Sequence, residues 1–252
     1  MTAPSASEFS ALWQDTLRRN DLPKYADDPA LCEAHYRLTC RMLEVNDHMN
    51  LTTITDLRGI LLRHYADSLH AARHLPQGAT VLDLGCGAGF PSLPLALARP
   101  DLSLTCLDST EKKARYVAET AALLGIPSDR LRAVCGRAEE LCTVGMPARE
   151  SFDVVISRAV ARLPVLCELS LPFLRVGGSL IALKGAQAEE ELEQATAAIS
   201  RLGGTPGSCL PAPLFPADGS PEERHALILI KKVTPTPKNY PRKYAQILKK
   251  PL

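Results

Sequence analysis

The sequence predicts a doubly wound α/β protein, in which a Rossmann-like, mostly parallel sheet of seven strands follows a helical N-terminal extension. Three observations predict this fold class. Short β-rich runs alternate with helical runs from Ala79 onward, which is the pattern of a parallel sheet. A glycine-rich turn joins the first of these strands to the next helix. The chain has 252 residues and is 46% hydrophobic, enough to bury one sizeable core and a small extension.

Residues 1–75 are predicted to form a helical N-terminal cap. Apolar residues from Phe9 to Leu17 recur at the spacing of one helix face. Asp56 stands at a position suited to an N-cap. Two further helices are therefore predicted, at residues 29–45 and 56–74.

Residues 76–233 are predicted to form the sheet domain. The predicted strands span residues 80–84, 103–108, 131–135, 152–157, 179–184 and 225–231. The predicted helices span residues 91–98, 111–124, 163–174 and 188–202. The Gly- and Pro-rich stretch 203–221 is predicted to be a loop with a short additional strand. Residues 234–252 form a basic tail stiffened by proline.

Charge is spread unevenly along the chain, although the net charge is only +1. Seven basic residues and no acidic residue lie between Lys231 and Leu252. Subtracting these seven from the 29 Lys and Arg leaves 22 against 28 acidic residues, a net charge of −6 for the first 230 residues. A basic tail on a mildly acidic body favours a polyanionic partner.

Several classes of protein are disfavoured by what the sequence lacks. No two of the eight cysteines form a C-x-x-C pair, so we expect reduced thiols and no metal site. The first residues show no basic and apolar signal regions, and no apolar run approaches the roughly 20 residues of a membrane span. We expect a cytoplasmic protein that does not engage a membrane.

The strongest motif is the run Asp83-Leu84-Gly85-Cys86-Gly87-Ala88-Gly89-Phe90-Pro91, which joins a strand to a helix. Glycines let a ligand approach the backbone closely, and ligands bind at the carboxyl ends of such strands. The pattern resembles the D-x-G-x-G-x-G fingerprint of class I methyltransferases. A nicotinamide-dependent dehydrogenase, which favours G-x-G-x-x-G, and a tight turn without a ligand are the alternatives.

The next two strands also end in candidate site residues. Asp108 lies 23 residues after Gly85, at a distance where a carboxylate typically accepts hydrogen bonds from a ribose. The alternative is that Asp108 only caps the following helix. After the third strand, the backbone of Ala138 and the carboxylate of Glu139 are placed to read the edge of an adenine. A solvated helix start is the alternative for that pair.

Further motifs make one likeness specific: the chain resembles the RsmG family, also called GidB, of bacterial 16S rRNA guanine-N7 methyltransferases. The matching motifs are Asn50-Leu51-Thr52, Arg63 to Leu69, the glycine loop, Asp108-Ser109 with Lys112-Lys113, Gly136 to Glu139, Ser157 to Ala161, Leu183-Lys184-Gly185, Glu223-Arg224-His225 and Tyr240-Pro241-Arg242. One position departs from the family pattern, because Ser92 stands where the family usually has glycine.

The resemblance implies S-adenosylmethionine as cofactor and a guanine in the 530 loop of 16S rRNA as target. It implies cofactor contacts at Gly85, Phe90, Asp108, Ser109, Ala138, Glu139 and Arg158. The motif itself adds Asp83, Gly87 and Gly89 to this set. No catalytic residue is identified, and Arg158 and Lys184 are candidates for positioning. A structural ion pair of Arg158 with Asp153 or Glu168 is the alternative.

Basic residues are candidates for an RNA surface. They are Arg63, His64, Lys184, Arg224, His225, Lys238, Arg242 and Lys243. His64 and Asp67 share a helix face, so a hydrogen bond between them is an alternative for His64. Tyr240 and Tyr244 are expected either to stack on nucleotides or to pack the tail onto the body.

The absence of two motifs disfavours two classes of methyltransferase. The N/D-P-P-aromatic motif of many exocyclic-amine methyltransferases and the Pro-Cys pair of pyrimidine-C5 enzymes do not occur. These absences leave a ring nitrogen, an oxygen or a small molecule as the target. The resemblance implies 16S rRNA, or the small ribosomal subunit during its assembly, as the partner, and we expect a monomer to bind it. The alternatives are a catalytically silent nucleotide-binding regulatory module and a small-molecule methyltransferase.

Overall fold

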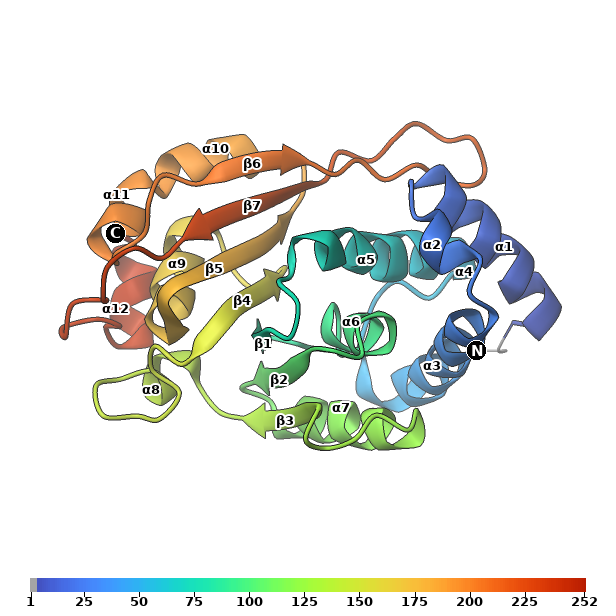
Figure 1. The fold of residues 1–252 in the computed structure, drawn as a ribbon, viewed down its shortest axis with the longest axis horizontal. Coiled ribbons are helices and arrows are strands. Elements are labelled where there is room, and N and C mark those ends of the chain that lie inside the picture. The colour runs from blue at the N-terminus through green and yellow to red at the C-terminus, as the bar shows by residue number, and fades with distance from the viewer. Residues whose placement is uncertain (1–3) are drawn as a thin grey trace.

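The computed structural model describes residues 4–252 and has a twisted open sheet at its centre (Figure 1). The strands of these residues are β1 (Thr80–Leu84), β2 (Ser103–Asp108), β3 (Leu131–Cys135), β4 (Phe152–Arg158), β5 (Leu174–Lys184), β6 (Ser208–Pro211) and β7 (Ala226–Lys231). They form a single sheet in the order β3-β2-β1-β4-β5-β7-β6, in which β7 alone runs in the opposite direction to the other six. The predicted fold class is confirmed.

The described part of the chain begins with α1 (Ala6–Arg19), α2 (Pro23–Ala26) and α3 (Pro29–Met49). Side-chain N-caps begin two of them, because Ser5 accepts a hydrogen bond from Glu8 N and Asp28 accepts one from Leu31 N. The buried face of α1 packs its Phe9 and Trp13 rings against other aromatic side chains from α3 and the next helix. The apolar spacing read from the sequence is therefore the packed face of α1.

The helix predicted at residues 56–74 is present but not uniform. Asp56 caps it, since its side chain accepts a hydrogen bond from Gly59 N at 2.7 Å. The helix begins as α4 (Leu57–Gly59), widens to π-helical hydrogen bonding over η1 (Ile60–Ala66), and ends as α5 (Asp67–Ala71) and the 3₁₀ turn η2 (Ala72–His74). π-helical turns are frequent at functional sites, and this one carries Arg63 and His64.

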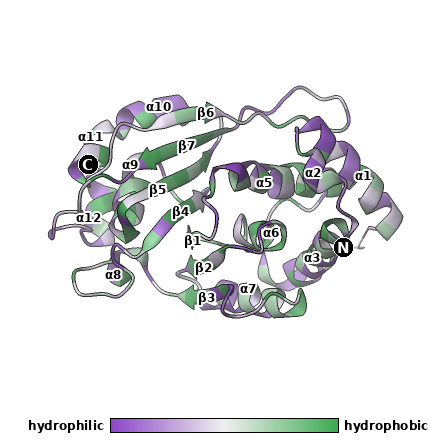
Figure 2. Ribbon diagram, viewed as in Figure 1, coloured by the Kyte–Doolittle hydropathy of each residue, from purple (hydrophilic) through white to green (hydrophobic). Residues whose placement is uncertain are grey.

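Two apolar layers cover the two faces of the sheet. Alternate strand residues such as Val81 and Leu104 pack with the N-terminal helices, α6 (Ser92–Ala98) and α7 (Glu111–Leu123). The other alternates, such as Leu82 and Leu107, face the second layer. That layer contains α8 (Ala138–Leu141), α9 (Leu163–Ser170), η3 (Leu171–Phe173), α10 (Ala188–Gln194), α11 (Thr196–Arg201) and α12 (Tyr244–Lys249). Figure 2 shows mostly hydrophobic strands β5 and β7, as expected for burial on both faces.

Some predicted boundaries are wrong. The helix predicted at residues 188–202 is divided at Ala195 into α10 and α11. Strand β5 begins at Leu174 rather than Ser179, because Leu174 pairs with Phe152 across an irregularity in the β4 register. The tail is not simply extended, since it ends in α12. The short strand expected within 203–221 is β6.

No helix among residues 4–252 combines the length and the apolar character needed to cross a membrane.

Candidate functional site

The glycine loop between β1 and α6 is anchored to the end of β2. The backbone N–H groups of Gly85 and Cys86 donate to the carbonyl oxygen of Leu107 at 2.8 and 3.0 Å. Gly85, Gly87 and Gly89 have φ angles of 72°, 55° and 85°, a region that favours glycine. At Gly87 a Cβ atom would meet nothing closer than the Gly85 carbonyl oxygen at 3.9 Å. The outer side of the loop is thus open to a ligand.

Asp83 lies behind this loop rather than on its open side. Its side chain is fully buried, and its Oδ2 accepts hydrogen bonds from Ser92 Oγ at 2.5 Å and Ser92 N at 3.2 Å. Burial raises the pKa of the Asp83 carboxyl to about 6, although the bonds from Ser92 oppose that shift. Ser92, the departure from the family pattern, therefore supplies a bond that glycine lacks.

Asp108 joins three segments at the carboxyl edge of the sheet. Its Oδ2 accepts from Gly87 N at 3.0 Å, and its Oδ1 accepts from Thr110 N at 2.8 Å. Its backbone oxygen accepts from Gly136 N at 3.0 Å. The carboxylate thus supports the turn into α7 and also contacts the glycine loop, and it lines two cavities.

Three cavities follow one another along this edge. The inner cavity, of about 120 Å³, lies among the ends of β1, β2 and β3 and includes Ala138 and Glu139. The loop cavity, of about 470 Å³, lies over the glycine loop and shares Gly85, Asp108, Ser109 and Val160 with the inner cavity. The outer cavity, of about 550 Å³, shares His64, Arg158, Ala159 and Val160 with the loop cavity. Together they form a continuous row.

Val160 stands at the junction of all three cavities. It follows Ala159, whose φ of 56° is unusual for a residue with a side chain. A Cβ atom placed on Gly85 would overlap the Val160 side chain, so the two residues are in close contact. The β4–α9 loop (residues 159–162) is therefore part of the site.

Arg158 ends β4 and links the loop cavity to the outer cavity. Its guanidinium group bonds the Arg63 carbonyl oxygen, lies 3.1 Å from His64 Nδ1 and 3.5 Å from Asp67 Oδ2, and stands 5.4 Å from the Phe90 ring centroid. The alternative interpretation, an ion pair of Arg158 with Asp153 or Glu168, is wrong. Those carboxylates instead pair with Arg175 and Arg242.

His64 is an uncharged aromatic side chain in this site. Its ring stacks on Phe90, with centroids 4.3 Å apart and planes 9° from parallel. Burial, with the Arg158 and Arg63 charges, lowers the pKa of His64 to about 3. Since Arg158 donates to Nδ1, the ring proton lies on Nε2 and is donated to Thr52 Oγ1 at 3.0 Å.

A series of hydrogen bonds and ion pairs between side chains continues from Arg158 around the outer cavity. Asp67 accepts from His225 Nδ1 at 3.3 Å, rather than forming the bond with His64 that was the alternative for that histidine. His225 also lies 3.7 Å from Glu223, which receives a bidentate hydrogen bond from Arg63. Two predicted RNA-binding side chains, Arg63 and His225, are therefore already paired with carboxylates.

Lys184 fixes the β4–α9 loop. Its ammonium group donates to the Ala161 carbonyl oxygen and to Glu191 Oε2, each at 2.7 Å. The same carboxylate oxygen accepts from Leu163 N at 2.7 Å. The Lys184 side chain is only 10% exposed, so it holds the loop more than it offers a free charge.

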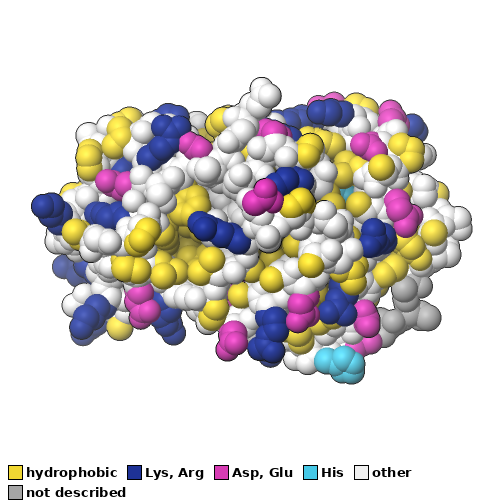
Figure 3. Space-filling view, turned by 60° about the horizontal axis from the view of Figure 1, so that its bottom comes forward, with side chains coloured by type: hydrophobic (Ala, Val, Ile, Leu, Met, Phe, Trp, Pro, Cys, Tyr) yellow, Lys and Arg dark blue, Asp and Glu magenta, His cyan; other side chains and the backbone are white. Residues whose placement is uncertain are grey.

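The remaining predicted RNA-binding residues divide into two kinds. Arg224, Lys238 and Lys243 are exposed. Arg242 is instead held in a bidentate pair with the buried carboxylate of Glu168. Figure 3 shows basic and acidic side chains interspersed on one face of the molecule rather than a single basic patch.

The sequence does not indicate the roles of two side chains in this site. Asp67 forms an ion pair with Arg158, and Glu191 forms one with Lys184. In the sequence, the spacing of Asp67 indicates only a helix-face neighbour of His64, and no motif includes Glu191. Glu191 lies seven residues after Lys184 and across a turn, so no local spacing links the pair.

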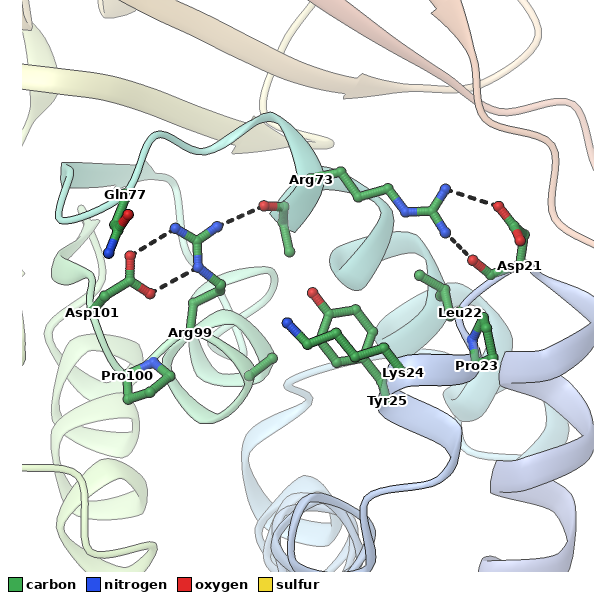
Figure 4. Close-up of a pocket in the computed structure, with 12 residues that line it drawn as sticks. Asp21, Leu22, Pro23, Lys24, Tyr25, Arg73, Gln77, Arg99, Pro100 and Asp101 are labelled. Atoms are coloured by element: carbon green, nitrogen blue, oxygen red, sulfur yellow. Dashed lines mark hydrogen bonds and ion pairs between the residues drawn. The ribbon is translucent and has the colours of Figure 1, made fainter.

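A larger cavity, of about 740 Å³, lies beside the segments that precede β1 and β2, away from the glycine loop (Figure 4). Its two arginines are already paired: Arg73 bonds Asp21, and Arg99 bonds Asp101. Ligands of open α/β sheets bind at the opposite edge, after the strands, so the row of three cavities is the candidate site.

Comparison with known proteins identifies the family. Residues 32–210 match the model of the GidB family, described as rRNA small subunit methyltransferase G. Ribosomal RNA small subunit methyltransferase G of Limosilactobacillus reuteri (strain DSM 20016) is 40% identical over 241 residues, covering 94% of this chain and 93% of the relative. The protein of the same name from Deinococcus radiodurans is 44% identical over 234 residues and covers 89% of each chain.

Solved structures of low sequence identity share the fold. Geranyl diphosphate C-methyltransferase from Streptomyces coelicolor A3(2), solved with S-adenosyl-L-homocysteine, aligns with a TM-score of 0.52 at 18% identity over 67% of this chain and 79% of its own. The [4+2]-cyclase SpnF has the same TM-score and identity over 67% of this chain and 82% of its own. These likenesses concern the fold alone.

The family match extends over more than half of the chain and includes the glycine loop, Asp108, Glu139 and Arg158. The resemblance inferred from the sequence motifs is thereby confirmed: this chain belongs to the GidB family of rRNA small subunit methyltransferases G.

Proposed function

We propose that this protein transfers a methyl group from S-adenosylmethionine to N7 of a guanine in the 530 loop of 16S rRNA. The observation that carries the proposal is the row of three cavities, which begins at Asp108 and the glycine loop and ends in a pocket lined by charged side chains. The cofactor, when bound, supplies an electrophilic methyl group on a sulfonium centre. The chain has to hold that group in line with a base.

The inner and loop cavities fit the cofactor. Asp108 is placed to accept hydrogen bonds from ribose hydroxyl groups, and the open backbone at Gly87 permits close approach. Ala138 and Glu139 lie beside the adenine position, and Ser109 lines both cavities. Gly85, Phe90 and Arg158 line the loop cavity and are assigned to the remaining cofactor contacts. Gly89, which the motif added to this set, instead packs against Leu93, and Asp83 supports the loop from behind.

The outer cavity fits the target base. It opens beside Arg158 and Val160, next to the loop cavity, so a flipped-out guanine there reaches the methyl group directly. Lys184 orients the loop between the two ligands. Exposed Arg224, Lys238 and Lys243 are the side chains we assign to phosphate contacts.

The partner is 16S rRNA, free or in an assembling small subunit, and the protein acts as a monomer in the cytoplasm, where that substrate is made. Mass spectrometry of 16S rRNA from cells lacking the gene tests the function. We expect one guanine of the 530 loop to lose a methyl group, and the wild-type gene to restore it. Unchanged methylation would contradict the proposal and favour a silent nucleotide-binding module or a small-molecule enzyme.

A further inference from the structure

The C-terminal tail contributes an aromatic ring to the inner cavity. Tyr244, the first residue of α12, lines this cavity together with Gly136, Arg137 and Ala138 of the β3–α8 turn. The Arg137 guanidinium carbon lies 5.7 Å from the Tyr244 ring centroid. A residue more than 100 positions away in the sequence thus closes the pocket around the ends of β1, β2 and β3.

A buried ion pair fixes Tyr244 in this place. Two residues earlier, Arg242 forms a bidentate pair with Glu168 of α9, with contacts of 2.6 to 3.2 Å. The backbone N–H of Arg242 also donates to Glu168 Oε1 at 2.9 Å. Glu168 is fully buried, and its neighbour Leu169 lines the same cavity as Tyr244. The position of the tyrosine is therefore set by the helix that also builds the pocket.

The segment 232–241, which leads into and begins the tail, is also held by hydrogen bonds to the body of the protein. Lys232 is fully buried and donates to the Leu171 carbonyl oxygen at 2.8 Å. Glu150 accepts from Thr236 N at 2.7 Å, and Arg149 donates to the Thr236 and Tyr240 carbonyl oxygens at 2.8 and 2.9 Å. These contacts involve both ends of the segment 232–242, so it behaves as part of the body and not as a flexible basic arm.

The walls of the inner cavity suit a flat heterocycle. Leu107 and Leu169 provide apolar surface, the Gly136–Ala138 backbone provides polar groups, and Glu139 provides a carboxylate that is 11% exposed. An aromatic ring adds a stacking surface, which every nucleobase can use because each has a π face. This combination matches an adenine with an exocyclic amine.

We propose that Tyr244 forms one wall of the adenine pocket of S-adenosylmethionine, so that the C-terminal tail is part of the cofactor site. The inference rests on the proposed function. It also gives the pairing of Arg242 with Glu168 a role, since that pair holds the segment that carries Tyr244 while Lys238 and Lys243 stay exposed.

Calorimetry with S-adenosylhomocysteine on the full chain tests this inference. Tyr244→Ala is expected to weaken binding by about 5- to 150-fold, the range for loss of one base–aromatic stack. Tyr244→Phe keeps the ring and should bind within about twofold of wild type. Leu248→Ala, at a 52% exposed apolar position of the same helix, is the matched control and should also bind normally.

A second ligand separates stacking from a general loss of structure. 5′-Methylthioadenosine has the adenine but not the amino acid, so its affinity should fall by the same factor in Tyr244→Ala. Affinity for 16S rRNA should stay within about twofold, because the changed contact is with the cofactor.

Tyr244→Trp provides a measurement that does not depend on a truncated side chain. The chain has one other tryptophan, Trp13, which is buried in the N-terminal helices, so a ligand-dependent change in emission beyond that of wild type reports on position 244. We expect S-adenosylhomocysteine to change that emission.

Normal affinity in Tyr244→Ala, or an unchanged Tyr244→Trp emission at saturating ligand, would overturn the inference while leaving the proposed function intact. Failure of the wild-type protein to bind S-adenosylhomocysteine would instead overturn the proposed function itself.

Discussion

At the scale of single residues, the site depends on carboxylates with more than one task. Asp108 accepts from Gly87 N and Thr110 N, and it also lines the inner and loop cavities. Asp83 supports the same loop from the buried side. The two acids lie at the carboxyl ends of neighbouring strands but differ in place: Asp108 lines the cavities, and Asp83 supports the glycine loop from the buried side.

Asp108→Ala should weaken S-adenosylhomocysteine binding by about 1–3 kcal/mol, because ribose hydroxyl groups and Gly87 N lose an acceptor. Calorimetry measures the change. Glu111→Ala, an exposed acid three residues further on, is the control and should bind normally. Affinity for RNA should hardly change, and a loss of RNA binding with intact cofactor binding would contradict the assignment of Asp108.

Because His64 is uncharged in the folded protein, the stability of the protein should depend on pH. Its pKa is lowered to about 3 in the folded protein, so between that pH and about 6.5 the unfolded state binds more protons. Stability should therefore fall as pH drops below about 6.5, by up to about 1.4 kcal/mol per pH unit from this group. Urea unfolding at pH 7, 6 and 5 should show a shallower decline for His64→Gln, and equal slopes would contradict the prediction.

At the scale of secondary-structure elements, the β4–α9 loop is held by one ion pair. Lys184 and Glu191 are 10% and 14% exposed and bond the loop at Ala161 and Leu163. Because Arg158, Ala159 and Val160 line both the loop cavity and the outer cavity, the position of this loop sets how the two cavities meet.

Lys184→Met should destabilise the protein by up to about 3 kcal/mol, since Glu191 is left without its cation, and the residual exposure reduces the full cost of a buried pair. Adding Glu191→Gln keeps an acceptor for Leu163 N and should recover part of the loss. Urea unfolding of the four proteins of this double-mutant cycle measures the coupling, and strict additivity would mean that the pair does not hold the loop.

Alanine substitutions at the neighbouring tail residues Arg242 and Lys243 should have different effects on stability and RNA binding. Arg242→Ala leaves the Glu168 carboxylate buried and unpaired, which should cost about 3–5 kcal/mol of stability. The Lys243 side chain is exposed, so Lys243→Ala should change stability by less than about 0.5 kcal/mol. It should instead reduce the log–log salt slope of RNA binding by roughly 0.7–0.9, the effect of one lost phosphate contact. The reverse pattern would show that Arg242 binds RNA and Lys243 packs.

What the sequence predicts and what it misses differ in physical origin. The strands and the glycine loop follow from local alternation and from backbone angles that only glycine adopts easily, so residues such as Gly85 and Gly87 could be found directly. The π-helical turn and the break at Ala195 come from tertiary packing. Tyr244 and Asp67 meet their partners across more than 90 residues, and spacing carries no signal over that distance.

At the scale of the whole molecule, the fold determines where ligands bind, and membership of the family indicates which reaction is catalysed. A methyltransferase and a [4+2]-cyclase share this fold, so the sheet alone does not decide the reaction. In this chain, two adjoining cavities share Arg158 and Val160. If cofactor and base occupy them as we propose, we expect proximity and orientation to supply most of the catalysis.

Guanine N7 carries a lone pair and no proton at neutral pH, so its methylation needs no general base. The residues around the junction of the loop and outer cavities agree with this. His64 keeps its neutral form far above its pKa of about 3 and already uses both ring nitrogens, and Arg158 is a cation. No single His, Asp or Glu substitution should abolish chemistry while leaving both ligands bound.

The pH dependence of a single turnover, with the methylated atom identified, tests guanine-N7 transfer most directly. Purified protein is mixed in excess with small-subunit rRNA and isotopically labelled S-adenosylmethionine, and the product is mapped by mass spectrometry. We predict a rate constant that varies by less than about twofold between pH 6.5 and 9, with all label on N7 of one guanine in the 530 loop. A log-linear rise with pH that one His, Asp or Glu substitution removes, or label on an oxygen or exocyclic nitrogen, would contradict it.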